Sequence, residues 1–289
     1  MRSARENAMS RSLAALSAML LASACQQSEV TPQASDAPPE QATAPAAITM
    51  SDEAASAPSP AVDPAAKGRK ESVDNDLYEF SYSYPAAAAR YPDLREWLDG
   101  DLEKKREEID EAAREDKASA TKDGYPYRPH SSGTEWQVVT DLPNWLSLSA
   151  QIYTYSGGAH GMTVSDTLLW DKTAQKVREP TELFVSDAAL RDAIRKPFCD
   201  ALDRERAKKR GEPVDRASGD MFTECIDPME SVVILGSAGG SGFDRIGVLV
   251  APYSAGPYAE GSYEVTLPVT PAVLRAVRPE FRGSFSAGG

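Results

Sequence analysis

Two alternating segments joined by a glycine-rich loop are the feature that most restricts the fold of this chain. Residues 146–152 place apolar side chains at every second position, and after the loop Val164, Leu168 and Trp170 likewise share one face. A period of two is typical of half-buried β-strands. Residues 153–161 read YTYSGGAHG and contain three glycines, which permit the positive φ angles of a tight turn. The pattern predicts an antiparallel hairpin.

Strand-like and helix-like patterns are interspersed along the rest of the chain. Helices are expected over residues 93–117, 187–210 and 271–278, strands over 77–84, 136–140, 231–235, 245–250 and 263–267, and a loop over 124–133. Ser186 or Asp187 is suited to begin the second helix, and Gly211 is suited to end it. Pro197 should kink that helix, and the basic run 204–210 suits its C-terminal end. Isolated helices among runs of strands predict an α+β fold with antiparallel sheets, a few packed helices and two sub-domains.

Residues 1–24 are typical of an export signal. Three arginines accompany an apolar run over residues 13–22, which is shorter than the roughly 20 residues that a membrane span needs. Small residues lead up to Cys25, as lipoprotein signal peptidase requires, although Ala22 stands where a lipobox prefers leucine. We therefore expect Cys25 to carry a lipid. In the alternative, ordinary cleavage after Ala24 yields a secreted soluble protein with an unmodified Cys25.

The residue after Cys25 bears on location. Gln26 is not the aspartate that retains lipoproteins in the inner membrane of enteric bacteria. For a Gram-negative source we expect an exported, periplasm-facing lipoprotein of the outer membrane, held to the membrane by its lipid anchor only.

Residues 25–70 have the composition of a spacer. They are rich in Ala, Pro and Ser, and their few aliphatic side chains cannot offset the entropy of ordering the segment. We expect a disordered tether there. The folded part is then about residues 71–289, enough for one large domain or two small ones.

The chain is strongly acidic. Its formal net charge is −13, and removal of residues 1–24 takes away three arginines and one glutamate and leaves −15. Such a surface disfavours nucleic acid and anionic lipid headgroups, and it favours basic partners. Many exported proteins are acidic for solubility alone, which is the alternative explanation.

Cys199 and Cys225 are left once Cys25 is assigned to the anchor. An even pair in an oxidising compartment predicts a disulfide, which would add about 3–4 kcal/mol of stability in the chain-entropy model. The alternative, a cysteine nucleophile, requires a nearby histidine and a reason for both thiols to stay reduced.

His160 is the residue that most resembles a catalytic side chain, yet no catalytic motif surrounds it. The other histidine, His130, falls in the expected loop, and no G-x-S-x-G, H-x-x-x-H or H-x-x-E-H string occurs. Residues 236–242 are glycine-rich, but they join two strands and therefore predict a hairpin loop rather than a phosphate cradle. We assign no catalytic residue, metal or cofactor. We expect His160 to anchor the glycine turn through backbone hydrogen bonds, with catalysis as the alternative.

Tyrosines on both sides of the glycine loop and near the C-terminus could stack on sugar rings. The candidate ligand-binding residues are Tyr153, Tyr155, Gly157, Gly158, His160, Tyr253 and Tyr258, and Tyr263 is a further tyrosine of this kind. The alternative is that these rings are half-buried parts of strands and corners, which tyrosine often is.

The string 153–161, followed by Trp170-Asp171 and by TELF at residues 181–184, resembles the RsiV/PdaC-type extracytoplasmic domain family. A second string over residues 248–261 follows in the same order. One position departs from the family, because Gln175 stands where the turn after Asp171 usually has glycine.

The resemblance implies a division of the folded part. A small N-terminal α+β region is expected at residues 71–145, and the C-terminal domain of the family at residues 146–289. Relatives include the outer part of an anti-sigma factor that senses lysozyme and a non-catalytic region attached to a peptidoglycan deacetylase.

The resemblance therefore implies a non-enzymatic, lipid-anchored envelope protein that binds peptidoglycan or a basic, lysozyme-like muramidase. One alternative is a hydrolase or deacetylase that acts on cell-wall glycan or peptide through His160. Another is a structural lipoprotein of an envelope complex. Because the sequence offers no transmembrane helix with a cytoplasmic sigma-binding segment, direct anti-sigma signalling is not expected.

Overall fold

The computed structural model describes residues 62–288 of the chain. The predicted export signal at residues 1–24, the lipidation of Cys25 and the tether as far as residue 61 lie outside the described residues. Within residues 62–288, no helix combines the length and the apolar character that crossing a bilayer would need.

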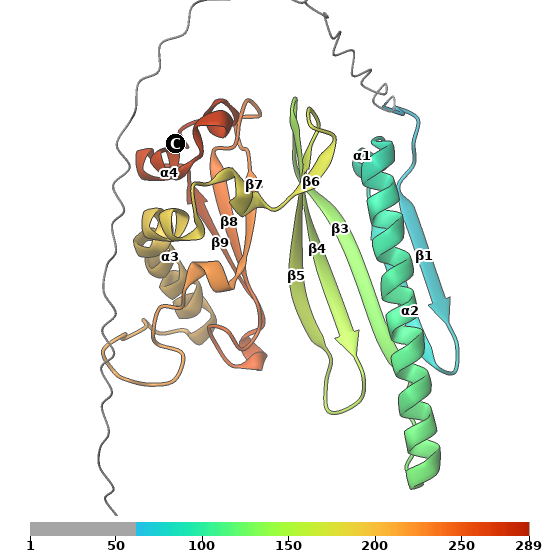
Figure 1. Cartoon of the computed structure of the whole chain (residues 1–289). Helices are drawn as coiled ribbons and strands as arrows, with labels where there is room; N and C mark the ends of the chain where they lie inside the picture. The colour runs from blue at the N-terminus through green and yellow to red at the C-terminus, as the bar shows by residue number, and fades with distance from the viewer. Residues whose placement is uncertain (1–61, 289) are drawn as a thin grey trace, which may run out of the picture. The chain divides into compact units, whose positions relative to one another are not determined.

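A six-stranded sheet occupies the first half of the described chain (Figure 1). Its strands lie side by side in chain order: β1 (Arg69–Asp74), β2 (Tyr78–Tyr84), β3 (His130–Leu142), β4 (Trp145–Tyr155), β5 (Met162–Asp171) and β6 (Lys176–Arg178). Neighbours pair antiparallel except β2 and β3, which are parallel. Parallel neighbours need a long crossover, and α1 (Ala86–Ala89) with α2 (Pro92–Asp123) supplies it.

Helix α2 covers one face of this sheet. Leu94, Leu98 and Leu102 recur every four residues, and all three side chains are fully buried against alternate residues of β2 and β4. Polar groups are paired within this core as well. Trp136 Nε1 donates to Tyr82 Oη at 2.8 Å, and Tyr82 Oη donates to a carboxylate oxygen of Asp101 on α2 at 2.7 Å. Burial raises the pKa of Tyr82, so its hydroxyl stays protonated and donates.

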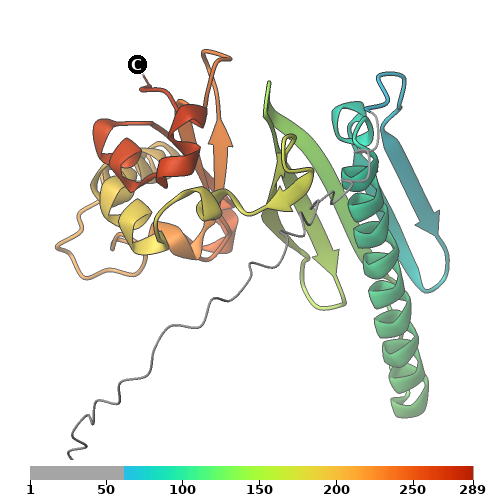
Figure 2. The ribbon, with the colours of Figure 1, turned by 45° about the horizontal axis from the view of Figure 1, so that its top comes forward.

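A three-stranded antiparallel sheet forms the second half. It consists of β7 (Val232–Gly236), β8 (Arg245–Val250) and β9 (Tyr263–Pro268). Helices α3 (Asp187–Arg210) and α4 (Pro271–Ala276) pack together, and α3 lies against β9 (Figure 2). Four short 3-10 helices complete the described secondary structure: η1 (Pro180–Leu183), η2 (Pro228–Glu230), η3 (Tyr258–Glu260) and η4 (Pro279–Ser284).

The core of the second half also takes in side chains from the first sheet. Leu142, Trp145 and Leu169 belong to the same buried cluster as β7–β9 and α3. Trp145 Nε1 donates to Ser284 Oγ at 2.8 Å, and the indole ring lies 6.0 Å from the ring of Phe243. The predicted boundary between residues 145 and 146 lies inside the six-stranded sheet, since β3 and β4 pair with each other on either side of it.

The structure confirms the predicted α+β fold and the hairpin of β4 and β5. The Ser186 side chain caps α3 by accepting a hydrogen bond from the amide of Ala189, and Gly211 ends the helix with a φ of 77°. Pro197 lies inside α3, which continues on both sides of it. Gln175 occupies the turn after Asp171 with a φ of 50°, the left-handed region that the usual glycine enters without strain.

Two expectations about the N-terminal half were wrong. Residues 124–133 are not all loop, because β3 begins at His130, whose side chain is buried and whose Nε2 lies 2.9 Å from a carboxylate oxygen of Asp116. Strand β1 begins within the segment expected to be tether. Its sequence RKESVD has a single apolar side chain, so it carries no alternating signal, and ion pairs from Arg69 and Glu71 to α2 hold it instead.

Cys199 and Cys225 form the predicted disulfide, with their Cα atoms 5.4 Å apart and a separation of 26 positions in sequence. The bond ties the middle of α3 to the loop that precedes η2. It therefore closes a segment with little regular structure against the core of the second half.

Replacing both cysteines, as in Cys199→Ala with Cys225→Ala, should lower the free energy of unfolding by about 3–4 kcal/mol, because the unfolded chain loses its cross-link. Urea unfolding of the full chain measures this. The wild type under reductant should lose a similar amount. A double variant within about 0.5 kcal/mol of the oxidised wild type would show that the bond contributes little.

Candidate functional site

The loop between β4 and β5 owes its shape to two glycines. Gly157 and Gly158 have φ angles of 102° and 89°, and a Cβ at either position would meet no neighbouring atom within 4 Å. The glycines are therefore required by backbone conformation and not by crowding. They bring Ala159, His160 and Gly161 to the start of β5.

Gly161 is required for a different reason. A Cβ at this position would lie 2.4–2.5 Å from the ring and hydroxyl atoms of Tyr153, so the Tyr153 ring rests directly on the Gly161 backbone. Tyr153 remains 42% exposed in this position. The absence of a side chain at Gly161 thus allows the solvent-exposed ring of Tyr153 to pack directly on the backbone.

His160 lies parallel to Tyr258, with ring centroids 3.8 Å apart and planes inclined by 18°. Its Nδ1 is 2.9 Å from the carbonyl oxygen of Gly161. A carbonyl can only accept, so Nδ1 carries the proton. In the neutral ring Nε2 is then an acceptor, and it lies 3.5 Å from the hydroxyl of Tyr253, which can donate to it.

The carbonyl of Gly161 receives a second hydrogen bond, from Tyr258 Oη at 2.8 Å. Tyr253 lies 5.5 Å from Tyr258 between ring centroids, is 48% exposed and has a φ of 69°. A non-glycine residue with positive φ is uncommon and is often found at functional sites. We refer to Tyr153, His160, Tyr253 and Tyr258 as the aromatic cluster.

The two tyrosines from the second half are held by arginines of α3. Arg206 Nε donates to the carbonyl of Ala255 at 2.8 Å, and Arg210 Nη2 donates to the same oxygen at 3.3 Å. Arg210 also pairs with the carboxylate of Glu260, at 2.9 Å from Nε. These contacts fix the loop between β8 and β9 at two points, at Ala255 between the two tyrosines and at Glu260 after Tyr258.

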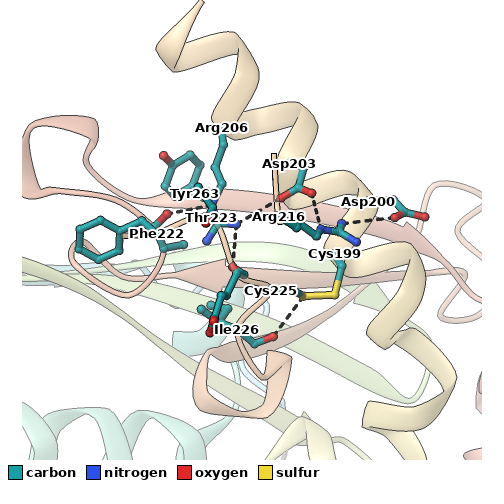
Figure 3. Close-up of polar contacts among 12 residues, drawn as sticks. Cys199, Asp200, Asp203, Arg206, Arg216, Phe222, Thr223, Cys225, Ile226 and Tyr263 are labelled. Atoms are coloured by element: carbon teal, nitrogen blue, oxygen red, sulfur yellow. Dashed lines mark hydrogen bonds and ion pairs between the residues drawn. A yellow bond between two sulfur atoms is a disulfide. The ribbon is translucent and has the colours of Figure 1, made fainter. Parts of the chain in front are cut away.

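Arg206 is fully buried, and Figure 3 shows its guanidinium between the disulfide loop and Asp203. Nη1 donates to the carbonyl of Glu224 at 2.9 Å and to a carboxylate oxygen of Asp203 at 3.2 Å. Burial lowers the pKa of Arg206, and the pair with Asp203 opposes this effect. From the sequence, residues 204–210 predict only a basic helix end, because no pattern distinguishes an arginine buried among carbonyl groups from a solvated one.

The remaining candidates lie apart from the aromatic cluster. Tyr155 donates to the carbonyl of Gly158 at 3.3 Å, and Gly157 and Gly158 line a separate cavity of about 270 Å³ with His130. Tyr263 is buried, its hydroxyl contacts Glu260, and burial raises its pKa to about 12, so it cannot stack on a ligand. The structure therefore brings together four of the candidates, and the fifth contributor, Gly161, was not among them.

The contacts of His160 describe what it can do chemically. Its hydrogen bonds within residues 62–288 go to a backbone carbonyl and a phenol, not to a carboxylate that would orient a general base. In the same part of the chain, no three His, Cys, Asp or Glu side chains are grouped so that they could hold a metal ion. The cluster offers aromatic faces, an imidazole acceptor and phenol hydroxyls, which together suit the binding of a sugar ring.

The glycine-rich loop of residues 236–242 is a hairpin turn between β7 and β8, as predicted. Asp244 accepts hydrogen bonds from the amides of Ala238 and Gly239, both at 2.8 Å. These bonds hold the pKa of Asp244 below its ordinary value. The backbone N–H groups that a phosphate would need as donors are therefore already bonded to the Asp244 carboxylate.

Gly161→Ala should displace the Tyr153 ring, because the new methyl group overlaps it. The ring is exposed and can swing into solvent, so the loss of stability should be small, about 1 kcal/mol or less. Two-dimensional NMR spectra of the aromatic protons measure the displacement. Gly283→Ala is the matched control, since a Cβ there meets nothing within 4 Å. Unchanged Tyr153 signals in Gly161→Ala would contradict the described contact.

Asp244→Asn should lower the free energy of unfolding at pH 7, because an amide side chain is a weaker acceptor for two backbone N–H groups. The folded pKa of Asp244 is depressed, so the carboxylate stabilises the fold above the unfolded pKa and loses this advantage as the pH falls through the folded value. Urea unfolding should show the difference from wild type shrinking below about pH 4. A difference that is constant with pH would contradict the assignment.

Comparison with known proteins agrees with this architecture. Residues 71–163, from β1 to the start of β5, match the family model described as Deacetylase PdaC. A crystal structure of a DUF3298 family member from Bacteroides fragilis is 16% identical, with 76% of this chain and 97% of that chain covered and a TM-score of 0.50. That likeness shows the fold. A DUF3298 family protein from Pseudomonas aeruginosa is 15% identical over 75% of this chain and 96% of its own, with a TM-score of 0.40. No curated protein is similar enough to match the sequence.

Proposed function

We propose that this protein, whose residues 71–163 form a PdaC-type domain, is a non-enzymatic module of the cell envelope that binds cell-wall glycan at its aromatic cluster. The proposal includes the lipid anchor at Cys25 and a periplasm-facing location at the outer membrane, as expected from the N-terminal sequence. The Cys199–Cys225 disulfide is consistent with an oxidising compartment.

The observation that carries the proposal is a set of exposed aromatic rings that are already held in place. Tyr153 rests on Gly161, and His160 is stacked on Tyr258. Tyr253 is half exposed on a backbone that is held in an unfavourable conformation. Rings fixed before binding lose little conformational entropy when a ligand arrives, so their contact area contributes to affinity. The positive φ of Tyr253 costs free energy of folding, and residues strained in this way are concentrated at functional sites.

Tyr253→Ala should weaken binding of the full chain to insoluble peptidoglycan by about tenfold or more, because it removes an aromatic ring that is 48% exposed. Sedimentation of the protein with purified sacculi measures the affinity. Tyr125→Ala is the matched control, since Tyr125 is 52% exposed and lines a separate cavity that contains no residue of the aromatic cluster. Equal losses in the two variants, or none in Tyr253→Ala, would remove the aromatic cluster from the binding surface.

A second candidate function is supported by charge. The net charge of −13, or −15 without residues 1–24, would attract a basic muramidase of the lysozyme type. Such a partner would act on the same cell-wall glycan, and its own basic surface would be the recognised feature.

If charge drives recognition, lysozyme binding measured by calorimetry should weaken strongly as salt rises from about 50 to about 500 mM, since screening shortens the range of the attraction. Bovine serum albumin, itself acidic, serves as a control for non-specific attraction of lysozyme to negative charge. Salt-independent binding, or none at low salt, would exclude an electrostatic lysozyme partner.

A further inference from the structure

The face of the six-stranded sheet turned away from α2 is lined by short polar side chains. Strand pairing aligns one residue from each of five strands in a row across the sheet: Ser72, Ser81, Gly133, Tyr153 and Thr163. In β2, the sequence neighbours of Ser81, Phe80 and Tyr82, point to the other face and are buried against α2. We call this row and the cavities over it the sheet groove.

Two cavities, of about 520 and about 500 Å³, lie on this face. Both are lined by Ser81, Gly133 and Tyr153, so they are two parts of one groove with the row as its floor. The floor is low because its middle residue lacks a side chain. A Cβ on Gly133 would already lie 3.0 Å from Ser81 Oγ.

The groove is continuous with the aromatic cluster through a single residue. Tyr153 lines both cavities, and its ring also rests on Gly161, whose carbonyl is bonded by His160 and Tyr258. A ligand stacked on the cluster can therefore extend onto the sheet without crossing an apolar surface. Four spacings between neighbouring strands give the row a length of about 19 Å.

The chemistry of the groove favours a neutral polymer rich in hydroxyl and amide groups. The floor carries no charge, whereas the flanks carry hydrogen-bonding groups on both sides: Lys70, Glu135 and Gln151 along one, Asp74 and Glu79 along the other. Carboxylates and an amide oxygen accept from sugar hydroxyl and acetamido N–H groups, and Lys70 donates. With Glu71, the linings of the two cavities contain one lysine and four carboxylates, which disfavours an anionic polymer.

An extended peptide fits this surface less well than a glycan. Backbone groups of β2, β3 and β4 are engaged in the sheet ladder, so they cannot pair with an added strand. The floor also lacks apolar pockets that would take alternate side chains. Tyr153 is its one aromatic face, which is the element that a sugar ring uses.

We propose that the sheet groove binds an extended, neutral glycan strand of N-acetylated sugars that continues from the sugar stacked on the aromatic cluster. The inference rests on the proposed function and adds to it the length and the path of the ligand. It predicts that affinity depends on the number of sugars, whereas the cluster alone would bind short and long oligomers alike.

Titration calorimetry of the full chain with N-acetylglucosamine oligomers of two and of six sugars tests the inference. The hexamer should bind about tenfold or more tightly than the dimer. Gly133→Val should remove that difference while leaving dimer affinity unchanged, because the branched side chain fills the floor of the groove. Gln137→Val is the matched control, on the same strand and the same face, and should keep the length dependence.

A second blocking variant guards against misfolding. Ser81→Leu fills the same floor from β2 without altering a glycine, and it should behave as Gly133→Val does. Dimer and hexamer binding with equal affinity would overturn the groove while leaving the cluster as a sugar site. Absence of binding to either oligomer by a folded wild type would count against both proposals. Tight binding of a lysine-rich peptide in the groove, abolished by both variants, would assign it to a cationic partner instead.

Discussion

The buried guanidinium of Arg206 is the contact on which the arrangement of the candidate site most depends. A fully buried charge is costly unless hydrogen bonds satisfy it. Arg206 offsets most of this cost by joining three segments: Asp203 within α3, the carbonyl of Glu224 beside the disulfide, and the carbonyl of Ala255 in the loop of the two tyrosines, while its buried Nη2 has no hydrogen-bond partner. Loss of any one of these partners would leave a buried N–H group of Arg206 unpaired. The stabilities of the three segments are therefore coupled through this side chain.

The aromatic cluster is assembled from both halves of the described chain. Tyr153, His160 and Gly161 come from the β4–β5 hairpin, whereas Tyr253 and Tyr258 follow β8. The direct contacts between the two groups are a ring stack and two hydrogen bonds, the longer of them at 3.5 Å, each contributing about 0.5–1.5 kcal/mol. That is too little to hold two bodies together alone. The shared core around Trp145 holds the two halves together, and this fixes the position of the aromatic cluster.

The parts of this fold that were predictable have strong local signals. Alternation specified the β4–β5 hairpin, and an N-terminal serine and a C-terminal glycine specified the ends of α3. Strand β1 was missed because the half-buried positions of this edge strand hold charged side chains, Arg69 and Glu71, that form ion pairs with α2, so burial alternates without an alternating apolar pattern in the sequence. The site shows the same division. The aromatic residues of the site could be named from the sequence. The partners of Arg206 and the row across the sheet could not, because they depend on strand register and long-range contacts that no local sequence pattern indicates.

NMR observation of the two imidazole rings during titration with soluble muropeptides tests the central claim most directly. The chain has only two histidines, so their ring signals are readily told apart: His160 belongs to the aromatic cluster, and His130 is buried beside Asp116. Our account predicts a saturable shift of the His160 signals while those of His130 stay in place. Saturable binding that leaves His160 unmoved, or that shifts His130 alone, would contradict the assignment of the aromatic cluster as the glycan-binding surface.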